Sequence, residues 1–243
     1  PVADDWRAYY TRDHPFHEVT VLFGYLAALT TRIELATAIL ILPQRPTALV
    51  AKQFAELDVL SAGRIRAGVG IGWNEVEFDA LGHDFSTRAA RMEEQMELLR
   101  ALWTQEIVHF DGRFDNISGV GINPLPVQRP IPLWIGAFVP AAIRRAGRLA
   151  DGLFLNPRVK PGAEAAGLIS QFREAADKAG RDANALGLDV TILTEGRGGN
   201  AIREEYEQWR ELGASHVTLR TMTAGLSRAG DHLEVLEQAL AAV

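Results

Sequence analysis

The chain contains no cysteine among its 243 residues. Disulfides and thiolate chemistry are therefore excluded, and histidines and carboxylates are the side chains left for a metal site. Long apolar runs are also absent, since none approaches the roughly 18 residues that a membrane-spanning helix needs. A formal net charge of −6 argues against a nucleic acid or an anionic membrane surface as partner. We therefore expect a cytoplasmic protein that binds neither nucleic acid nor membrane.

Several catalytic patterns are missing as well. The six histidines form no H-E-x-x-H pair, and His14 and His17 have no third ligand close to them in the sequence. There is no G-x-S-x-G nucleophile elbow and no Walker loop. Arg144, Arg145 and Arg148 fit a solvated helix face better than a phosphate clamp. The sequence thus predicts no metal site and identifies no catalytic acid or base.

What is present is an alternation of short apolar runs with amphipathic segments. Residues 33–42 and 65–70 are two apolar runs on either side of a helix-period segment, which indicates a βαβ unit. The alternation continues to the end of the chain. Strands are expected at 33–42, 65–70, 132–136, 152–155, 186–193 and 215–219. Helices are expected at 15–30, 46–60, 86–103, 140–151, 161–179, 200–212 and 231–242, with Leu49 on the apolar face of the second and Ser86 as the N-cap of the third.

Strands joined by helices are parallel, and near-continuous apolar strands fit a sheet that is covered on both faces. This pattern suits both a (β/α)8 barrel and an open doubly wound sheet, and it leaves that choice open. We expect one domain over residues 1–243. Residues 107–131 are expected to form a loop insertion that carries a hairpin turned at Asp111-Gly112. Pro1–Asp13 lacks an initiator Met and reads as the middle of a loop, so we expect the numbering to begin inside a longer natural chain.

Two segments with small residues follow expected strands. The first, Gly68 to Asn74, reads G-V-G-I-G-W-N, with Trp73 in the place of the third glycine of a dinucleotide fingerprint. Its glycines either relieve crowding at a strand end or let the backbone approach a ligand. The second, Gly136 to Val139, precedes a helix whose unpaired amides favour an anion, although an ordinary loop is equally compatible. Ligands of parallel α/β folds bind at the carboxyl ends of strands, where both segments lie.

Taken together, the ordered blocks of this sequence resemble the bacterial luciferase-like family of flavin and deazaflavin oxidoreductases. The similarity is dense over residues 15–157 and thins afterwards, and it is greatest to the branch expected to use the deazaflavin coenzyme F420. The matching blocks are residues 37–45, 51–53, 57–64, 68–73, 77–78, 80–82, 123–124, 126–130, 134–136 and 150–152. The resemblance implies a (β/α)8 TIM-like barrel, in which family members have a strand, a helix and a strand before the segment that starts here.

The resemblance also implies a cofactor site. The strand end at Thr37–Ile39 matches the place where the family has a non-proline cis peptide, Ala38–Ile39, under the isoalloxazine ring. Gly70–Asn74 matches the loop at the edge of the ring, and Gly136–Val139 matches the loop that holds the cofactor phosphate. The expected cofactor-binding residues are therefore Thr37, Ala38, Ile39, Gly70, Gly72, Trp73, Asn74, Gly136, Ala137, Phe138 and Val139. The chain departs from the family at Ala62, where glycine is usual, and at Phe138 and Val139, which replace small polar residues.

Three functions follow as alternatives. The first is hydride transfer between F420 and a small organic substrate. The second is an FMN-dependent luciferase-like monooxygenase that needs a separate flavin reductase as partner. The third is a binding member of the family that has lost catalysis, which the departures at Phe138 and Val139 favour. The helices at 15–30 and 46–60 carry more apolar residues than one buried stripe needs, so we also expect a homodimer across them.

Overall fold

The computed structural model describes residues 15–222 and 224–243. The chain divides into two compact units, the first ending at Pro132 and the second beginning at Leu133, and each is described by itself. That the two units form one domain stays a prediction. Within both units, parallel strands alternate with helices, as the hydrophobic pattern predicts. No helix in the described part of the chain is long and apolar enough to span a bilayer.

The sheet of the first unit consists of β1 (Leu35–Ala36), β2 (Leu40–Ile41) and β3 (Ile65–Gly70). Both β1 and β2 pair with β3 in parallel, with Leu35 opposite Ile65 and Leu40 opposite Val69. The prediction of a single strand at 33–42 is therefore wrong, because the segment Thr37–Ile39 separates β1 from β2. The predicted strand at 65–70 is confirmed without change.

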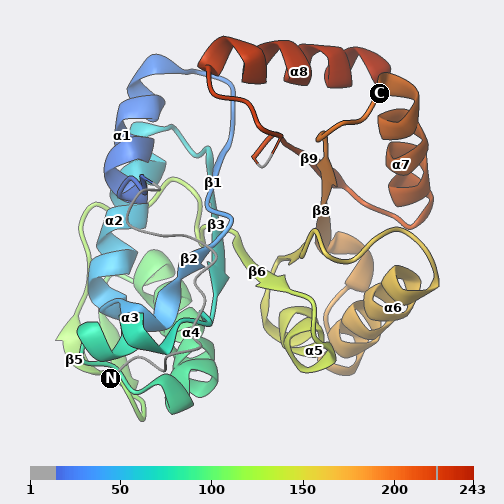
Figure 1. The fold of residues 1–243 in the computed structure, drawn as a ribbon. Coiled ribbons are helices and arrows are strands. Elements are labelled where there is room, and N and C mark those ends of the chain that lie inside the picture. Colours follow the sequence, from blue (N-terminus) through green and yellow to red (C-terminus); the bar gives the residue numbers. More distant parts are fainter. Residues whose placement is uncertain (1–14, 223) are drawn as a thin grey trace. The chain divides into compact units, whose positions relative to one another are not determined.

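The described part of the first unit, residues 15–132, contains four α-helices. Their bounds are α1 (Val19–Leu29), α2 (Thr47–Leu60), α3 (Glu75–Ala80) and α4 (Arg88–Thr104), and two 3-10 turns accompany them, η1 (Leu42–Gln44) and η2 (Phe85–Thr87). Figure 1 shows α1 and α2 beside each other along the strands. The sequence pattern missed α3, whose six residues are too few to show a helical period. Ser86 does not cap α4: it follows Asp84, whose carboxylate accepts hydrogen bonds from the Ser86 amide and hydroxyl and caps η2 instead.

The core of the first unit lies between α2, α4 and β3. Phe54, Met96 and Leu99 are fully buried there, and the indole of Trp103 donates to the carbonyl of Ala51 at 3.0 Å. The prediction that Leu49 is buried on α2 is wrong. Leu49 is 53% exposed, because the face of α2 that packs inwards carries Val50, Phe54 and Leu57 instead.

The predicted insertion forms a hairpin of β4 (Val108–Asp111) and β5 (Asn116–Val120). Its turn spans residues 112–115 and is held from α4 by Glu94, whose carboxylate accepts from the backbone amides of Arg113, Phe114 and Asp115 at 2.7–2.8 Å. The proline-rich connector after it is anchored at Gln128, whose amide and side chain both donate to the buried carboxylate of Asp58. The connector is thus fixed to the core by hydrogen bonds as well as by its prolines.

The second unit repeats the βα pattern along its whole length. Its elements are β6 (Leu133–Ala137), α5 (Pro140–Leu149), β7 (Gly152–Leu155), α6 (Ala163–Lys178), η3 (Ala183–Ala185), β8 (Gly187–Leu193), α7 (Gly199–Glu211), β9 (His216–Arg220) and α8 (Ala229–Ala242). The four strands pair in parallel in chain order. Helices α5, α6 and α7 lie on one side of the strands (Figure 1). Each predicted element of this unit is confirmed to within two residues at either end.

The two faces of this second sheet differ. Towards the helices, Leu133, Ile135, Val190 and Ile192 are fully buried. On the other face the indole of Trp134 lies across two neighbouring strands, where an added Cβ at Gly152 or Gly187 would come within 2.3 Å of the ring. Glycine at these two positions therefore provides the room that the indole occupies.

Candidate functional site

The interruption between β1 and β2 is a β-bulge. Four residues lie between Leu35 and Leu40, whereas three lie between their partners Ile65 and Val69, so the β1–β2 segment carries one extra residue. The Thr37 hydroxyl, in a side chain that is 4% exposed, donates to the Gly68 carbonyl at 2.7 Å and accepts from the Gly68 amide at 2.9 Å. The hydroxyl therefore replaces the backbone partner that the bulge removes.

The peptide bond between Ala38 and Ile39 is cis, which confirms the feature that the family resemblance implies. The Ile39 side chain lies over Gly70, where an added Cβ would be 1.9 Å from Ile39 Cδ1. Gly72 has φ +75°, and a Cβ there would be 2.8 Å from Ile41 and 3.0 Å from Phe78. Of the two readings of these glycines, relief of crowding is thus present in the structure, and contact with a ligand stays a prediction.

A cavity of about 790 Å³ lies in the first unit where the strands end. Its wall includes five of the expected residues, Thr37, Ala38, Ile39, Gly72 and Trp73. Trp73 and Ile39 offer the most open apolar surface among these, being 42% and 37% exposed. Gly70 lies beneath Ile39 instead, and Asn74 is buried at the start of α3. The strand ends therefore converge on one largely apolar space.

Two further polar side chains belong to this wall, Gln44 and Glu77. The Glu77 carboxylate accepts from Gln44 Nε2 at 3.1 Å and from Asn74 Nδ2 at 2.9 Å. This arrangement leaves the carbonyl oxygen of Asn74 buried and without a hydrogen-bond partner among the described residues. Both residues lie inside the blocks that carry the family resemblance, but their spacing in sequence, 33 residues apart, gives no signal that they meet.

An ion pair borders the cavity at the start of α1. Arg45 of the cavity wall lies 3.2 Å from the Glu18 carboxylate, and the same carboxylate caps α1 by accepting from the Val21 amide. Burial acts to raise the pKa of Glu18, but the hydrogen bonds from Thr20, Val21 and Arg45 outweigh it and hold that pKa below its usual value. Glu18 therefore fixes the helix start and neutralises the guanidinium at once.

His83 supports the cavity from behind. Burial and the nearby Arg91 lower the pKa of His83 from 6.5, against a hydrogen bond to the Gln44 backbone that acts to raise it. The Arg91 guanidinium lies 3.2 Å from His83 Nδ1, a contact that requires this ring nitrogen to be the unprotonated acceptor. The neutral imidazole thus links α4 to the η1 segment that carries Gln44.

The other expected residues lie in the second unit. Gly136 and Ala137 end β6, while Phe138 and Val139 are exposed in the loop before α5. No side chain caps α5, and Pro140 occupies its first turn. The Asn156 amide donates to the Ala137 carbonyl at 3.1 Å, which ties this loop to the end of β7. The loop thus offers backbone amides rather than polar side chains to an anion.

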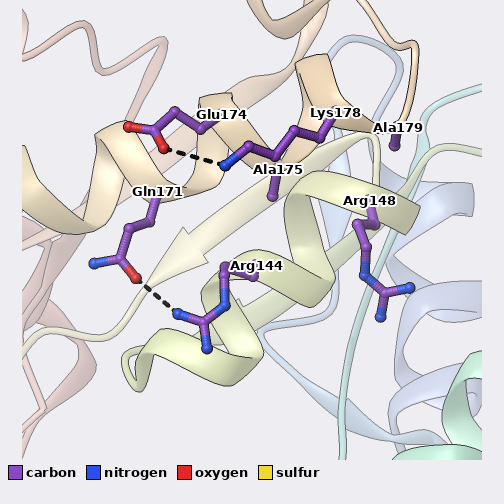
Figure 2. A pocket seen from close by; sticks show the side chains of 7 residues that line it. All are labelled: Arg144, Arg148, Gln171, Glu174, Ala175, Lys178 and Ala179. Atoms are coloured by element: carbon purple, nitrogen blue, oxygen red, sulfur yellow. Dashed lines mark hydrogen bonds and ion pairs between the residues drawn. The ribbon is translucent and has the colours of Figure 1, made fainter.

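A smaller groove of about 310 Å³ runs between α5 and α6 (Figure 2). Arg144 of α5 donates to Gln171 at 2.9 Å, and Lys178 pairs with Glu174 on α6 at 3.6 Å. Arg148 and Lys178 lie in the last turns of their helices, where the helix dipole favours cations and opposes an anion. Helix electrostatics therefore account for this basic groove. Elsewhere in the described residues, no three acidic or histidine side chains gather as metal ligands would.

With this geometry established, the family profile described as luciferase-like monooxygenase matches residues 2–196 of the chain. The chain belongs to this family. The match covers both glycine-bearing loops and the cavity described above. It confirms the family that the sequence blocks resemble.

Related proteins from this family differ in the cofactor that their names state. Rv0940c, an uncharacterized protein of Mycobacterium tuberculosis, is 38% identical over 71% of this chain and 63% of its own length. An F420-dependent glucose-6-phosphate dehydrogenase of Nakamurella multipartita is 36% identical over 65% of this chain and 47% of its own. An FMNH2-dependent dimethylsulfone monooxygenase of Pseudomonas putida is 33% identical over 77% of this chain and 51% of its own length. The chain thus spans between about half and two-thirds of the length of these relatives.

Solved structures establish the fold. An F420-dependent secondary alcohol dehydrogenase matches 88% of this chain and 81% of its own with a TM-score of 0.77 at 19% identity. The coenzyme F420-dependent tetrahydromethanopterin reductase of Methanopyrus kandleri matches 92% of this chain and 86% of its own length, again with a TM-score of 0.77, at 16% identity. The fold of this luciferase-like chain is that of part of a (β/α)8 TIM-like barrel, which resolves the alternative that the hydrophobic pattern left open.

Replacing Thr37 by Val removes both hydrogen bonds to Gly68 and leaves two buried backbone groups unsatisfied, so we expect a loss of about 1–3 kcal/mol in the free energy of unfolding. Thr37→Ser keeps the hydroxyl and should lose clearly less. Urea denaturation of the three proteins measures the difference. Equal stability of the Val and Ser variants would show that the hydroxyl does not hold the bulge.

The lowered pKa of His83 predicts a pH-dependent stability. Between the folded-state pKa and the unfolded value of 6.5, the unfolded chain binds more protons, so the free energy of unfolding falls as the pH falls below 6.5. His83→Gln should reduce the loss of stability between about pH 7.5 and 5.5. His109→Gln, at an exposed position of the hairpin, serves as the control. An unchanged pH dependence of stability in His83→Gln would contradict the attribution of this pH dependence to His83.

Proposed function

We propose that the chain is an oxidoreductase that transfers a hydride between coenzyme F420 and a small organic substrate, with the ring of the cofactor at the cavity of the first unit. The observation that carries the proposal is the convergence of Thr37–Ile39 and Gly72–Trp73 on one cavity at the strand ends, in a chain whose family includes relatives named for F420 and FMN. Ligands of parallel α/β folds bind at these ends.

The residues present fit a flat, mostly apolar ring with polar edges. Ile39 and Trp73 supply open apolar surface, and the absence of a Cβ at Gly72 lets the backbone come close. The unpartnered carbonyl of Asn74, held in place by Glu77, is an acceptor suited to a ring N–H.

In this proposal the cofactor supplies the redox chemistry when bound. Ile39 and Trp73 would orient the ring and exclude water from its face, while Glu77 keeps the Asn74 amide in one orientation. The backbone amides from Gly136 to Val139, which precede α5 in the second unit, stay the predicted holders of the cofactor phosphate. No side chain is assigned as the catalytic acid or base, and the substrate class stays at a small molecule.

Two alternatives retain specific support. FMN in place of F420, with a separate flavin reductase as partner, is favoured by the similarity to the FMNH2-dependent monooxygenase. A binding member without catalysis is favoured by Phe138 and Val139, which bring no polar atom to the phosphate loop. A cytoplasmic location is part of the proposal in each case.

Titration with F420 and with FMN, followed by cofactor fluorescence, tests the proposal. Gly72→Ala should weaken F420 binding by roughly tenfold or more, equivalent to about 1.4 kcal/mol, because its methyl group would displace Ile41 and Phe78 at the cavity. Gly82→Ala is the matched control, since Gly82 has a similar φ of +71° but nothing within 4 Å of the added Cβ.

The outcomes separate the alternatives. Binding of F420 with the expected difference between the two glycine variants supports the proposal. Tight binding of FMN without binding of F420 overturns the cofactor assignment. Binding of neither cofactor to a protein that carries the complete barrel favours the binding member.

We also propose a homodimer through α1. Val21, Tyr25 and Leu29 follow each other at four-residue intervals and are 73%, 65% and 63% exposed, on the face opposite the buried Phe23 and Ala27. Such a stripe on a helix that is already packed against α2 is a surface suited to a second copy, because a two-fold axis can place it against itself.

Light scattering at micromolar concentration should give twice the mass of the chain. Tyr25→Glu should shift the mass to that of a monomer, because a charge then lies in the contact. Leu233→Glu, which alters an apolar residue of α8 that is 60% exposed, should leave the dimer intact. A monomeric mass for the unaltered protein would refute this assembly.

A further inference from the structure

Arg220 is the last residue of β9 and carries a charge that the proposed function does not use. In the parallel pairing of β8 with β9, Arg220 lies opposite Leu193. Because side chains alternate along a strand, Arg220 shares a face with Thr218, whose hydroxyl donates to Asp189 at 2.8 Å. Val190 and Ile192 alternate along β8 with Asp189 and Leu193, and their side chains are buried on the helix side of the sheet. Arg220 therefore lies on the sheet face away from α7.

The guanidinium of Arg220 has no partner among the residues that the structure describes. The residue is half-buried, and its Nε is buried without a hydrogen bond. Other arginines with a buried, unbonded Nε use their remaining nitrogens: Arg88 donates to the Phe85 carbonyl and Arg91 contacts His83. Over residues 15–222 and 224–243, no carboxylate pairs with Arg220 and its guanidinium makes no hydrogen bond. Such a buried donor is unfavourable unless something else satisfies it.

The backbone of the same residue is firmly held. The Arg220 carbonyl accepts from the amide and the hydroxyl of Thr194, at 3.1 and 3.2 Å, and Thr194 is only 3% exposed. The end of β9 is thus tied to the end of β8, at the edge of a parallel sheet where ligands bind. A fixed backbone that carries a half-buried guanidinium, with its Nε buried and unbonded, is the arrangement expected of a preorganised binding group.

We propose that the Arg220 guanidinium binds an oxyanion, a carboxylate or phosphate group of a small molecule, at the carboxyl end of the sheet in the second unit. Its planar fork of donors matches two oxygens of either group. The inference goes beyond the proposed function, because it does not depend on which cofactor the chain uses. The oxyanion can belong to a substrate or to the phosphate of the cofactor, and a comparison of FMN with riboflavin distinguishes these two sources.

Thermal unfolding with added sodium phosphate, against sodium chloride at equal ionic strength, tests this proposal. The unaltered protein should gain a phosphate-specific rise in Tm that Arg220→Met loses and Arg220→Lys keeps in part. Arg144→Met, which removes an exposed arginine of α5, should keep the full rise. Phosphate that is excluded from the protein surface stabilises all variants alike. Only a difference between variants in the phosphate-specific rise in Tm therefore reports binding at Arg220.

In phosphate-free buffer, Arg220→Met should also raise Tm, by roughly 2–4 °C, because an unsatisfied buried donor is removed. Equal phosphate effects in the unaltered protein and Arg220→Met overturn the proposal, and Arg220→Gln provides the same comparison if the Met variant does not fold.

The two sources of the oxyanion are separated by comparing FMN with riboflavin, which lacks the phosphate. If Arg220→Met loses the preference for FMN, the group is the phosphate of the cofactor. If the preference is unchanged while the inorganic phosphate effect is lost, the group belongs to a substrate. Failure of the unaltered protein to bind either F420 or FMN would count against the proposed function alone, because the inorganic phosphate comparison does not use a cofactor.

Discussion

The contact between the Thr37 hydroxyl and the backbone of Gly68 is the interaction on which the rest of the first unit depends. It satisfies both polar groups of a buried residue at the point where the neighbouring strand bulges away. With this contact, β2 can pair with β3 one residue out of step with β1. The same shift brings Ile39 over Gly70 and Ile41 beside Gly72, so two apolar side chains fill the space that the glycines provide.

The strand ends then shape the cavity, and the polar residues around it act in pairs. Glu77 satisfies Gln44 and Asn74, and Glu18 satisfies Arg45 and the start of α1. Both carboxylates at this wall are therefore held by hydrogen bonds or an ion pair within the first unit. What the cavity offers is mainly apolar surface, from Ile39 and Trp73, which supports a flat ring as ligand.

Much of the fold could be predicted from the sequence, because buried strands and amphipathic helices leave a periodic signal. The strands at 65–70 and 152–155 are confirmed to the residue. The failures have local causes. Periodicity shows 33–42 as one apolar run, since a threonine that bonds to a distant glycine reads like any other strand residue. Ser86 looks like a helix cap, but Asp84 is the better acceptor and takes the role for η2.

The candidate site divides in the same way. Thr37–Ile39 and Gly70–Asn74 are visible in the sequence because they form part of blocks that the family shares. The sequence does not indicate Gln44, Glu77 or Arg220 as site residues, because their significance lies in contacts made or missing in three dimensions. A pattern along the chain records which residues are present but not which donors stay unsatisfied.

A crystal structure of the protein with F420 or FMN bound tests the central claim most directly. The account predicts the cofactor ring against Ile39 and Trp73, with its edge towards Asn74. A ring bound elsewhere, with the surface of Thr37–Ile39 free of ligand, would contradict it.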